Sequence, residues 1–286
     1  MQAINGIRLH IAEAGPADGP PVLLLHGFPE FWYGWRHQLG PLADAGFRTV
    51  APDQRGYGES DKPGPISAYG LDTLADDAAA LVESAGHPDA AVVGHDWGGI
   101  VAWWLAIRRP DLVRRLVVIN APHPIVFRRR LAKSPRQLLR SWYAFYFQVP
   151  RLPEALFRRR NWASLAESMR ATSRPGTFSD ADLDRYRAAW SAPGAMTAML
   201  HWYRAAMRVP PSARDDVRVH AQTRMIWGAK DGFLERGLTR PSLDLCDRGT
   251  LEVIEDATHW VQHEEPARVN RLILSFLRDG DAAQGR

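Results

Sequence analysis

The part of this chain that most constrains its fold is residues 94–99, which read Gly-His-Asp-Trp-Gly-Gly. This segment comes directly after the apolar run 90–93 and directly before an apolar stretch that contains Trp103 and Trp104. A sharp strand-to-helix turn that projects one side chain leaves little room two positions before and after it, where Gly94 and Gly98 stand. An Asp can also serve only as a helix N-cap, but capping does not account for both glycines. The segment therefore predicts a strand, a tight turn that presents Asp96, and a helix.

The hydrophobic pattern predicts the α/β fold class. Up to residue 121, short apolar runs alternate with longer stretches of helical period, which is typical of a mostly parallel sheet flanked by helices. From 122 to 210 the pattern is helical and interrupted by prolines, and after 211 the alternation resumes. We expect one core domain of residues 1–121 and 211–286, with residues 122–210 inserted as a helical cap over the carboxyl ends of the strands. The expected strands are 7–13, 22–25, 48–51, 90–93, 116–119, 223–227 and 251–255, and the expected core helices lie near 32–45, 71–84, 98–108, 238–246 and 266–277.

Composition excludes several protein classes. Cys246 is the single cysteine, and no group of Cys and His has the spacing of zinc ligands, so neither a disulfide scaffold nor a structural metal is expected. The N-terminus lacks the pattern of a signal peptide, and no run approaches the roughly 20 apolar residues that span a bilayer. We therefore expect a cytoplasmic protein without a membrane span.

Positive charge is concentrated in one region. Residues 121–180 contain 12 Lys or Arg but 3 Asp or Glu, and they include the triplets 128–130 and 158–160 of three arginines each. Such a surface can face nucleic acid, an anionic membrane or an acidic partner. No nucleic-acid-binding motif accompanies it, so we expect a solvated surface and no nucleic-acid partner. The sequence does not distinguish a monomer from a homodimer.

An Asp at the tight turn points to attack on carbon. A carboxylate with a pKa of ~3.9 is already ionised at pH 7 and needs no base to act as a nucleophile. The ester that it forms must then be hydrolysed, which requires an activated water and an oxyanion hole. His26-Gly27-Phe28-Pro29 follows the apolar run 22–25, so the backbone N–H groups of Phe28 and Trp97 are expected to form that hole.

A histidine and a second carboxylate follow later strands. His259 comes shortly after the expected strand 251–255, which brings it to the same edge of the sheet as Asp96. Asp231 follows the expected strand 223–227 and is suited to orient His259 as a general base. His263 and Asp256 are weaker candidates for these two roles. The order nucleophile, acid, histidine is that of α/β-hydrolases.

These residues, together with 53–60 (Asp-Gln-Arg-Gly-Tyr-Gly-Glu-Ser) and Trp202-Tyr203-Arg204, resemble the epoxide hydrolases of the α/β-hydrolase superfamily over nearly the whole chain. The resemblance implies that Asp96 opens an epoxide, that two cap tyrosines hold the epoxide oxygen, and that a vicinal diol leaves without any cofactor. The matching tyrosines are Tyr143 and Tyr203, although spacing alone does not choose Tyr143 over Tyr146. The cap holds 13 of the 28 aromatic residues, which predicts a small apolar epoxide as substrate. Residues expected to contact that substrate are His26, Trp142, Tyr146 and Trp202.

Two other functions remain open. A haloacid or haloalkane dehalogenase uses the same aspartate nucleophile, but the haloacetate dehalogenases that resemble this chain usually have Arg after it and a His-Trp pair in place of Trp142-Tyr143. This chain has Trp97 at the first position and both cap tyrosines. A ligand receptor with this fold could lose catalytic groups freely, whereas here each group that the two-step reaction requires can be assigned.

Overall fold

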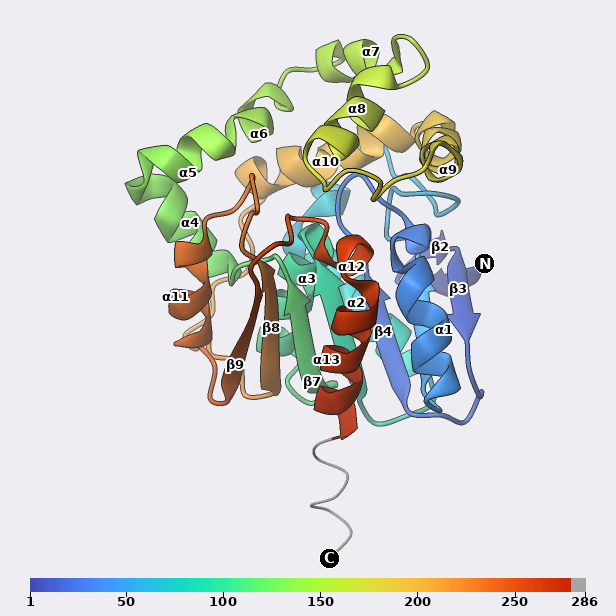
Figure 1. The fold of residues 1–286 in the computed structure, drawn as a ribbon, viewed down its shortest axis with the longest axis vertical. Helices are drawn as coiled ribbons and strands as arrows, with labels where there is room; N and C mark the ends of the chain where they lie inside the picture. The colour runs from blue at the N-terminus through green and yellow to red at the C-terminus, as the bar shows by residue number, and fades with distance from the viewer. Residues whose placement is uncertain (279–286) are drawn as a thin grey trace, which may run out of the picture.

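The computed structural model describes residues 1–278, and within them a twisted seven-stranded sheet forms the centre of the molecule (Figure 1). The strand order is β3-β5-β4-β6-β7-β8-β9, in which β3 runs antiparallel to β5 and the other neighbours are parallel. This arrangement confirms the predicted fold class. The strands are β1 (Gln2–Ile4), β2 (Ile7–Leu9), β3 (Ile11–Ala14), β4 (Pro21–Leu25), β5 (Arg48–Pro52), β6 (Ala90–His95), β7 (Val113–Ile119), β8 (Gln222–Gly228) and β9 (Gly249–Ile254).

Helices cover both faces of the sheet. Those outside the cap are the 3-10 helices η1 (Trp32–Trp35), η2 (Ile66–Tyr69) and η3 (Arg236–Leu238), and α1 (Arg36–Asp44), α2 (Leu71–Ser84), α3 (Trp97–Arg108), α11 (Thr239–Leu243), α12 (Val261–Glu264) and α13 (Pro266–Arg278). Between β7 and β8 the chain forms α4 (Pro124–Lys133), α5 (Pro135–Arg140), α6 (Trp142–Tyr146), α7 (Leu152–Arg158), α8 (Ala163–Ala171), α9 (Asp180–Ser191) and α10 (Ala195–Arg208). None of these described helices is both long and apolar enough to cross a membrane.

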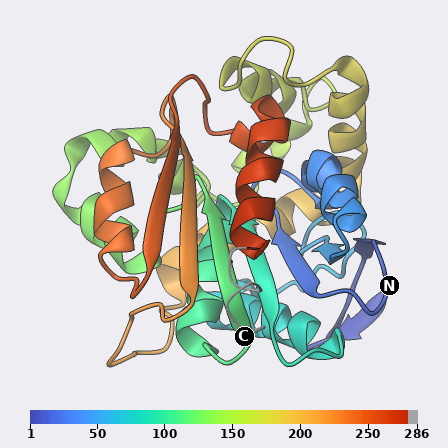
Figure 2. The same cartoon turned by 60° about the horizontal axis from the view of Figure 1, so that its bottom comes forward.

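The central strands are apolar on both sides because both faces are covered. In β4, Val22 and Leu24 belong to the core formed with α1 and α13, whereas Leu23 and Leu25 belong to the core on the opposite face. Side chains of a strand point alternately to the two faces, so a fully buried strand is a continuous apolar run. Figure 2 shows α1 and α13 packed together on one face of the twisted sheet.

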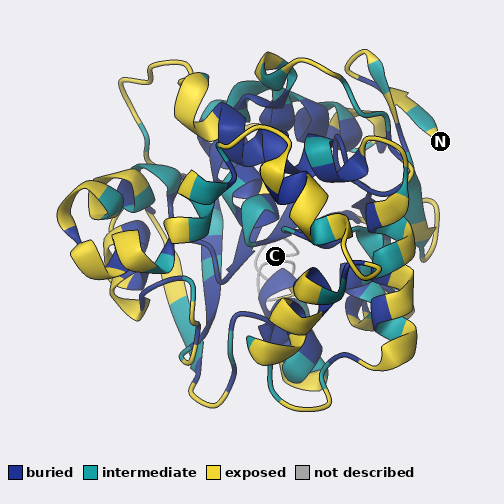
Figure 3. Ribbon diagram, turned by 90° about the horizontal axis from the view of Figure 1, so that it is seen from above, coloured by how far each residue is buried: buried dark blue, intermediate teal, exposed yellow. Residues whose placement is uncertain are grey.

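The inserted helices α4 to α10, which we call the cap, lie over the carboxyl ends of the parallel strands (Figure 1). Two indole N–H groups join the cap to core loops: Trp190 Nε1 donates to the carbonyl of Pro29 at 2.7 Å, and Trp202 Nε1 donates to that of Arg55 at 3.0 Å. Seen from above, buried residues gather in the interior while exposed residues lie on the outer faces of the helices (Figure 3). The cap and the core therefore share a packed interface above the ends of the strands.

Local interactions change some of the predicted elements. The expected strand 7–13 is two strands, because β2 pairs with β1 across the turn at Asn5-Gly6, whereas β3 pairs with β5. Asn5 and Gly6 have φ of 45° and 78°, which is the conformation that an Asn-Gly hairpin turn needs. The expected helix 238–246 ends at Leu243, since the chain then turns to form an isolated bridge between Cys246 and Val219.

Candidate active site

Asp96 lies at a strained turn between β6 and α3, with φ of 50° and ψ of −120°. Positive φ is costly for a residue with a side chain and is found mainly where surrounding structure enforces it. The neighbouring glycines allow this turn to pack closely. A Cβ at Gly98 would overlap the carbonyl groups of Leu25 and His26, and a Cβ at Gly94 would overlap the backbone of Gly98. The segment 94–99 thus forms the predicted strand, turn and helix.

The two carboxylate oxygens of Asp96 have different neighbours. Oδ1 accepts a hydrogen bond from the Phe28 N–H at 2.9 Å, and Oδ2 lies 3.5 Å from His259 Nε2. Trp97 is the first residue of α3, where backbone N–H groups have no acceptor within the helix. Phe28 and Trp97, the two residues predicted to form an oxyanion hole, therefore both flank the Asp96 carboxylate.

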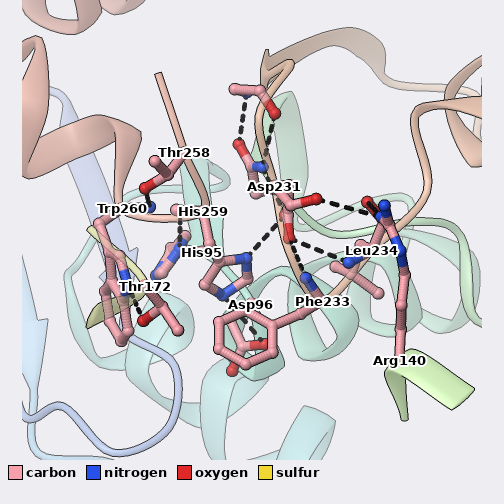
Figure 4. Close-up of polar contacts among 12 residues, drawn as sticks. His95, Asp96, Arg140, Thr172, Asp231, Phe233, Leu234, Thr258, His259 and Trp260 are labelled. Atoms are coloured by element: carbon pink, nitrogen blue, oxygen red, sulfur yellow. Dashed lines mark hydrogen bonds and ion pairs between the residues drawn. The ribbon is translucent and has the colours of Figure 1, made fainter. Parts of the chain in front are cut away.

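His259 lies between Asp96 and Asp231 (Figure 4). Its Nδ1 lies 2.8 Å from Asp231 Oδ2, which also accepts a hydrogen bond from Asn120 Nδ2 at 2.6 Å. Asp231 Oδ1 accepts the N–H groups of Phe233 at 2.7 Å and Leu234 at 2.9 Å. This arrangement uses the acceptor positions of Asp231 and holds the His259 ring with Nε2 toward Asp96.

The charges around His259 control its pKa. Burial by itself would lower that pKa, but the neighbouring carboxylates, Asp231 first and then Asp96, raise it to about 10. For Asp231, burial by itself would raise the pKa, but His259 and the hydrogen bonds to the carboxylate lower it below the usual range. In the absence of a ligand, this geometry favours a charged imidazolium between two carboxylates.

Aromatic side chains from the cap and the core surround Asp96. The Tyr203 ring, on α10, lies 5.1 Å from the Trp97 ring and 5.2 Å from the Phe28 ring. Tyr143, on α6, lies 6.0 Å from Tyr203 and 5.8 Å from Phe233, whose ring in turn contacts His259. Tyr203 is buried and Tyr143 is partly buried, and burial together with the Asp96 charge raises the pKa of each phenol well above its usual value.

The structure separates Tyr143 from its neighbours on α6. Tyr143 packs inward, whereas Trp142 is 62% exposed and its ring contacts Tyr146. Consecutive residues of a helix point about 100° apart, so turning Tyr143 inward directs Trp142 to the outer surface. We therefore correct the expectation that Trp142 contacts substrate. Tyr146 is partly exposed and lies beside Trp142 and Phe147, not among the rings around Asp96 described above.

The other two residues expected to contact substrate have structural partners. His26 is buried, and its Nε2 lies 3.1 Å from the backbone N of Gln54. Trp202 is buried, donates its indole N–H to Arg55, and packs its ring 5.9 Å from that of Trp97. These contacts make both residues supports for the loops around Asp96.

The two weaker candidates from the sequence occupy other positions. Asp256 is an exposed partner of Lys230 at 2.9 Å. His263 is buried, and its Nε2 lies 2.7 Å from Glu30 Oε1. Neither residue contacts Asp96 in the structure, which leaves His259 and Asp231 as the pair beside it.

Several residues of the site were missed in the sequence. Glu30 is buried and also accepts a hydrogen bond from the Tyr186 hydroxyl at 2.8 Å, and its Oε2 lies 3.2 Å from His95. His95 Nε2 lies 3.0 Å from the carbonyl of His259, so this group supports the loop that carries the imidazole. Asn120 has φ of 43°, a conformation that Asn adopts more readily than most residues, and its place at the end of a strand was an unused signal.

The described residues hold no cluster of three His, Cys, Asp or Glu side chains that could bind a metal ion. The arrangement around Asp96 instead combines a carboxylate, a histidine paired with a second carboxylate, backbone donors and two phenols. Such a site can form and hydrolyse an ester on the carboxylate.

Comparisons with known proteins agree with this geometry. Residues 20–266 match the family model described as the alpha/beta hydrolase fold. The AB hydrolase superfamily protein YfhM of Bacillus subtilis is 48% identical over 275 residues, which are 96% of each chain, and epoxide hydrolase 1 of Caenorhabditis elegans is 39% identical over 96% of this chain and 69% of its own. The structure of a Bacillus megaterium epoxide hydrolase with an inhibitor superposes with a TM-score of 0.88 at 29% identity, covering 96% of this chain and 99% of that one. The chain therefore belongs to the epoxide hydrolase family of the α/β-hydrolase superfamily.

Proposed function

We propose that this protein opens an apolar epoxide to a vicinal diol through an ester formed on Asp96. The observation that carries the proposal is the pair of phenols, Tyr143 and Tyr203, which come from separate cap helices, contact each other and lie among the aromatic rings next to Asp96. Opening of an epoxide creates an alkoxide, and a phenol can donate a proton to it while being neutral at pH 7.

In the first step, Oδ2 of Asp96 attacks an epoxide carbon because Oδ1 is held by the Phe28 N–H. The bond between that carbon and the ring oxygen breaks, and its electron pair goes to the oxygen. Tyr143 and Tyr203 hold this oxygen, and one of them donates the proton. The product is a neutral hydroxyalkyl ester of Asp96, with Oδ1 as its carbonyl oxygen.

Formation of the ester changes His259. The negative charge of Asp96 is one cause of the raised pKa of the imidazole, and the ester removes that charge. The pKa of His259 therefore falls and the imidazolium releases a proton, and a proton returns to the phenolate that gave its own to the alkoxide. His259 becomes the neutral base that the second step requires, while Asp231 continues to hold its Nδ1–H.

In the second step, His259 Nε2 takes a proton from a water molecule, whose oxygen attacks the ester carbonyl carbon. The developing charge on Oδ1 is stabilised by the N–H groups of Phe28 and Trp97. The intermediate then collapses, the bond to the diol oxygen breaks, and the imidazolium returns its proton to that oxygen. The diol leaves, and the Asp96 carboxylic acid that remains gives its proton to His259, which restores the carboxylate and the imidazolium.

Trapping the ester tests this scheme. His259→Gln removes the base for the second step, so the ester should accumulate when the protein is briefly exposed to styrene oxide. Intact-protein mass spectrometry should show a gain equal to the whole epoxide, and peptide mapping should assign it to the peptide that contains Asp96. The double variant His259→Gln with Asp96→Asn is the control and should gain no mass.

Parallel exposure of His259→Gln to chloroacetate and fluoroacetate separates the alternatives. A gain equal to the haloacid minus hydrogen halide, without an epoxide adduct, would make the protein a dehalogenase. No adduct with either kind of reagent, extended to a panel of epoxides, would contradict the proposal and favour a ligand receptor.

A further inference from the structure

We propose that the outer face of the cap docks on the surface of an anionic lipid bilayer. The docking face consists of α5, α6, α7 and the loop between α6 and α7, which follow one another along the outer edge of the cap (Figure 1). The docking does not depend on the reaction at Asp96, but its use for supplying an apolar substrate rests on the proposed function.

Exposed apolar side chains are concentrated on this face. All but two of the exposed large hydrophobic residues among residues 1–278 lie between positions 138 and 156. Their exposed fractions run from 37% for Leu156 to 73% for Leu139. Except for Leu139, they recur every three or four residues, and the full set is Leu138, Leu139, Trp142, Phe145, Val149, Leu152 and Leu156. These residues, which we call the apolar stripe, lie on three consecutive helices and the loop between the last two, and such a concentration of exposed apolar side chains marks an interaction site.

The docking face and the cap segments next to it, α4 and residues 159–160, carry a large excess of positive charge. Residues 122–160 contain ten Lys or Arg and one acidic residue, Glu154, which is buried and paired with Arg204 at 2.8 Å. Arg130 and Arg136 approach Glu235 of the core. The exposed cations of this region for which the described residues provide no carboxylate within ion-pair distance are Arg128, Arg129, Lys133, Arg151, Arg158, Arg159 and Arg160.

An open cleft extends this positive surface beside α7. It has a volume of about 470 Å³ and lies between α7, the loop before it and the end of α10. Arg151, Arg158 and Arg208 line it, and no described carboxylate pairs with these three side chains. The cleft therefore places cationic groups along α7, the helix that also carries the exposed Leu152 and Leu156.

Charge decides between a bilayer and a second copy of this chain. A twofold contact between two caps would place the same surface of each copy face to face and bring their arginines together. An anionic bilayer instead offers phosphates to the arginines and an apolar interior to the stripe, which is the combination that interfacial helices use. Trp142, the most exposed aromatic side chain of the stripe, has the amphipathic ring that is enriched at membrane surfaces.

Docking would bring the lipid close to the site at Asp96. Helix α6 directs Trp142 and Phe145 outward, whereas Tyr143 on the same helix packs toward Tyr203. The site is thus separated from the docking face by the thickness of one helix. An apolar epoxide dissolves preferentially in a bilayer, so a docked cap would sit where such a substrate is concentrated.

Vesicle flotation tests the proposal without measuring activity. The wild-type protein should float with vesicles of equal parts phosphatidylglycerol and phosphatidylcholine, bind pure phosphatidylcholine at least about tenfold more weakly, and lose binding to the anionic vesicles at high salt. Leu139→Ser with Phe145→Ser removes two exposed apolar groups and should weaken binding to the anionic vesicles about tenfold or more. Equal binding to both kinds of vesicle, or unchanged binding by this variant, would overturn the proposal.

Charge reversal provides a second variant with a matched control. Arg151→Glu with Arg158→Glu should weaken vesicle binding about tenfold or more, whereas Arg248→Glu with Arg271→Glu changes net charge equally away from the cap and should bind within about twofold of wild type. Circular dichroism checks that each variant is folded. If the apolar variant does not fold, the two charge variants still test the proposal. Equal losses of vesicle binding in both charge variants would contradict the assignment of the docking face. A dimer in light scattering that Leu139→Ser with Phe145→Ser dissociates, without vesicle binding, would assign the face to self-association instead.

Discussion

At the scale of single residues, Asp96 and Asp231 have the same side chain but different surroundings. The side chain of Asp231 is fully buried, and both of its oxygens accept hydrogen bonds from the protein. The side chain of Asp96 is 19% exposed, and its Oδ2 faces His259 at a longer distance. A carboxylate with its acceptor positions occupied is suited to orient a histidine, and one with an accessible oxygen is suited to attack. The different surroundings therefore support the two roles that the proposed mechanism gives to these carboxylates.

The two phenols lead to a prediction at this scale. Tyr143→Phe and Tyr203→Phe each remove one donor to the epoxide oxygen, and each should slow ester formation about 10- to 100-fold, because the remaining phenol compensates in part. Single-turnover kinetics with styrene oxide measure this step directly. Tyr146→Phe is the comparison that matters, since its ring lies toward the outer surface. A loss for Tyr146→Phe as large as that for Tyr143→Phe would contradict the assignment of Tyr143.

The ionisation of His259 leads to a second prediction. Its pKa is raised from 6.5 to about 10 in the folded protein, so the charged pair with Asp231 stabilises the fold fully below about pH 6.5. This contribution should be lost as the pH rises from 6.5 to 10. Urea unfolding across that range should show a decline in the free energy of unfolding that is smaller in His259→Gln. Parallel curves for the two proteins would contradict the charged state of His259.

At the scale of elements, the turn between β6 and α3 depends on close backbone packing. Gly98→Ala would push a methyl group into the carbonyl groups of Leu25 and His26, which belong to β4 and the loop that carries Phe28. We expect a loss of about 1–3 kcal/mol in the free energy of unfolding. We also expect lower kcat, because the shift would move the Phe28 N–H away from Asp96.

A second helical glycine provides the control. A Cβ at Gly40 in α1 would meet nothing within 4 Å apart from its neighbours along the chain, so Gly40→Ala should change the free energy of unfolding by less than about 1 kcal/mol, because the gain in helix propensity is opposed by crowding against Pro41. Urea unfolding of both variants makes the comparison. Similar effects at the two positions would show that packing at the turn does not require glycine at 98.

At the scale of the whole molecule, buried polar contacts hold the cap on the core. Glu30 of the core contacts Tyr186 of cap helix α9 and His263 of α12, and His95 links this group to the loop of His259. Burial alone would raise the pKa of Glu30, but His263 and His95 lower it well below its usual value. The group therefore couples the position of the cap to the position of the imidazole.

Removal of one of these contacts should destabilise the fold. Tyr186→Phe leaves the buried Glu30 carboxylate without one of its donors, and we expect a loss of about 1–3 kcal/mol in urea unfolding. Tyr33→Phe is the matched control, because the Tyr33 hydroxyl donates to Asp182, which is partly exposed and can bind water instead. If Tyr33→Phe lowers the free energy of unfolding as much as Tyr186→Phe does, the buried contacts of Glu30 contribute no more than the partly exposed contact of Asp182.

Features that depend on neighbours along the chain could be predicted from the amino-acid sequence. The glycines around Asp96 predicted the turn, and the apolar runs predicted the parallel sheet, because strand, helix and turn preferences act over a few residues. His259 and Asp231 were found because each follows a strand, and parallel strands end at one edge of the sheet.

Contacts between side chains that are far apart in the sequence could not be predicted in the same way. Spacing did not distinguish Tyr143 from Tyr146, and it did not show that Trp142 lies on the outer surface, because the face that a short helix buries is set by what packs against it. The partners of α6 are Tyr203 and Phe233, which lie 60 to 90 positions further along the chain. Glu30 was missed for the same reason, since its contacts with Tyr186 and His263 exist only after the cap and the last helices have packed on the core.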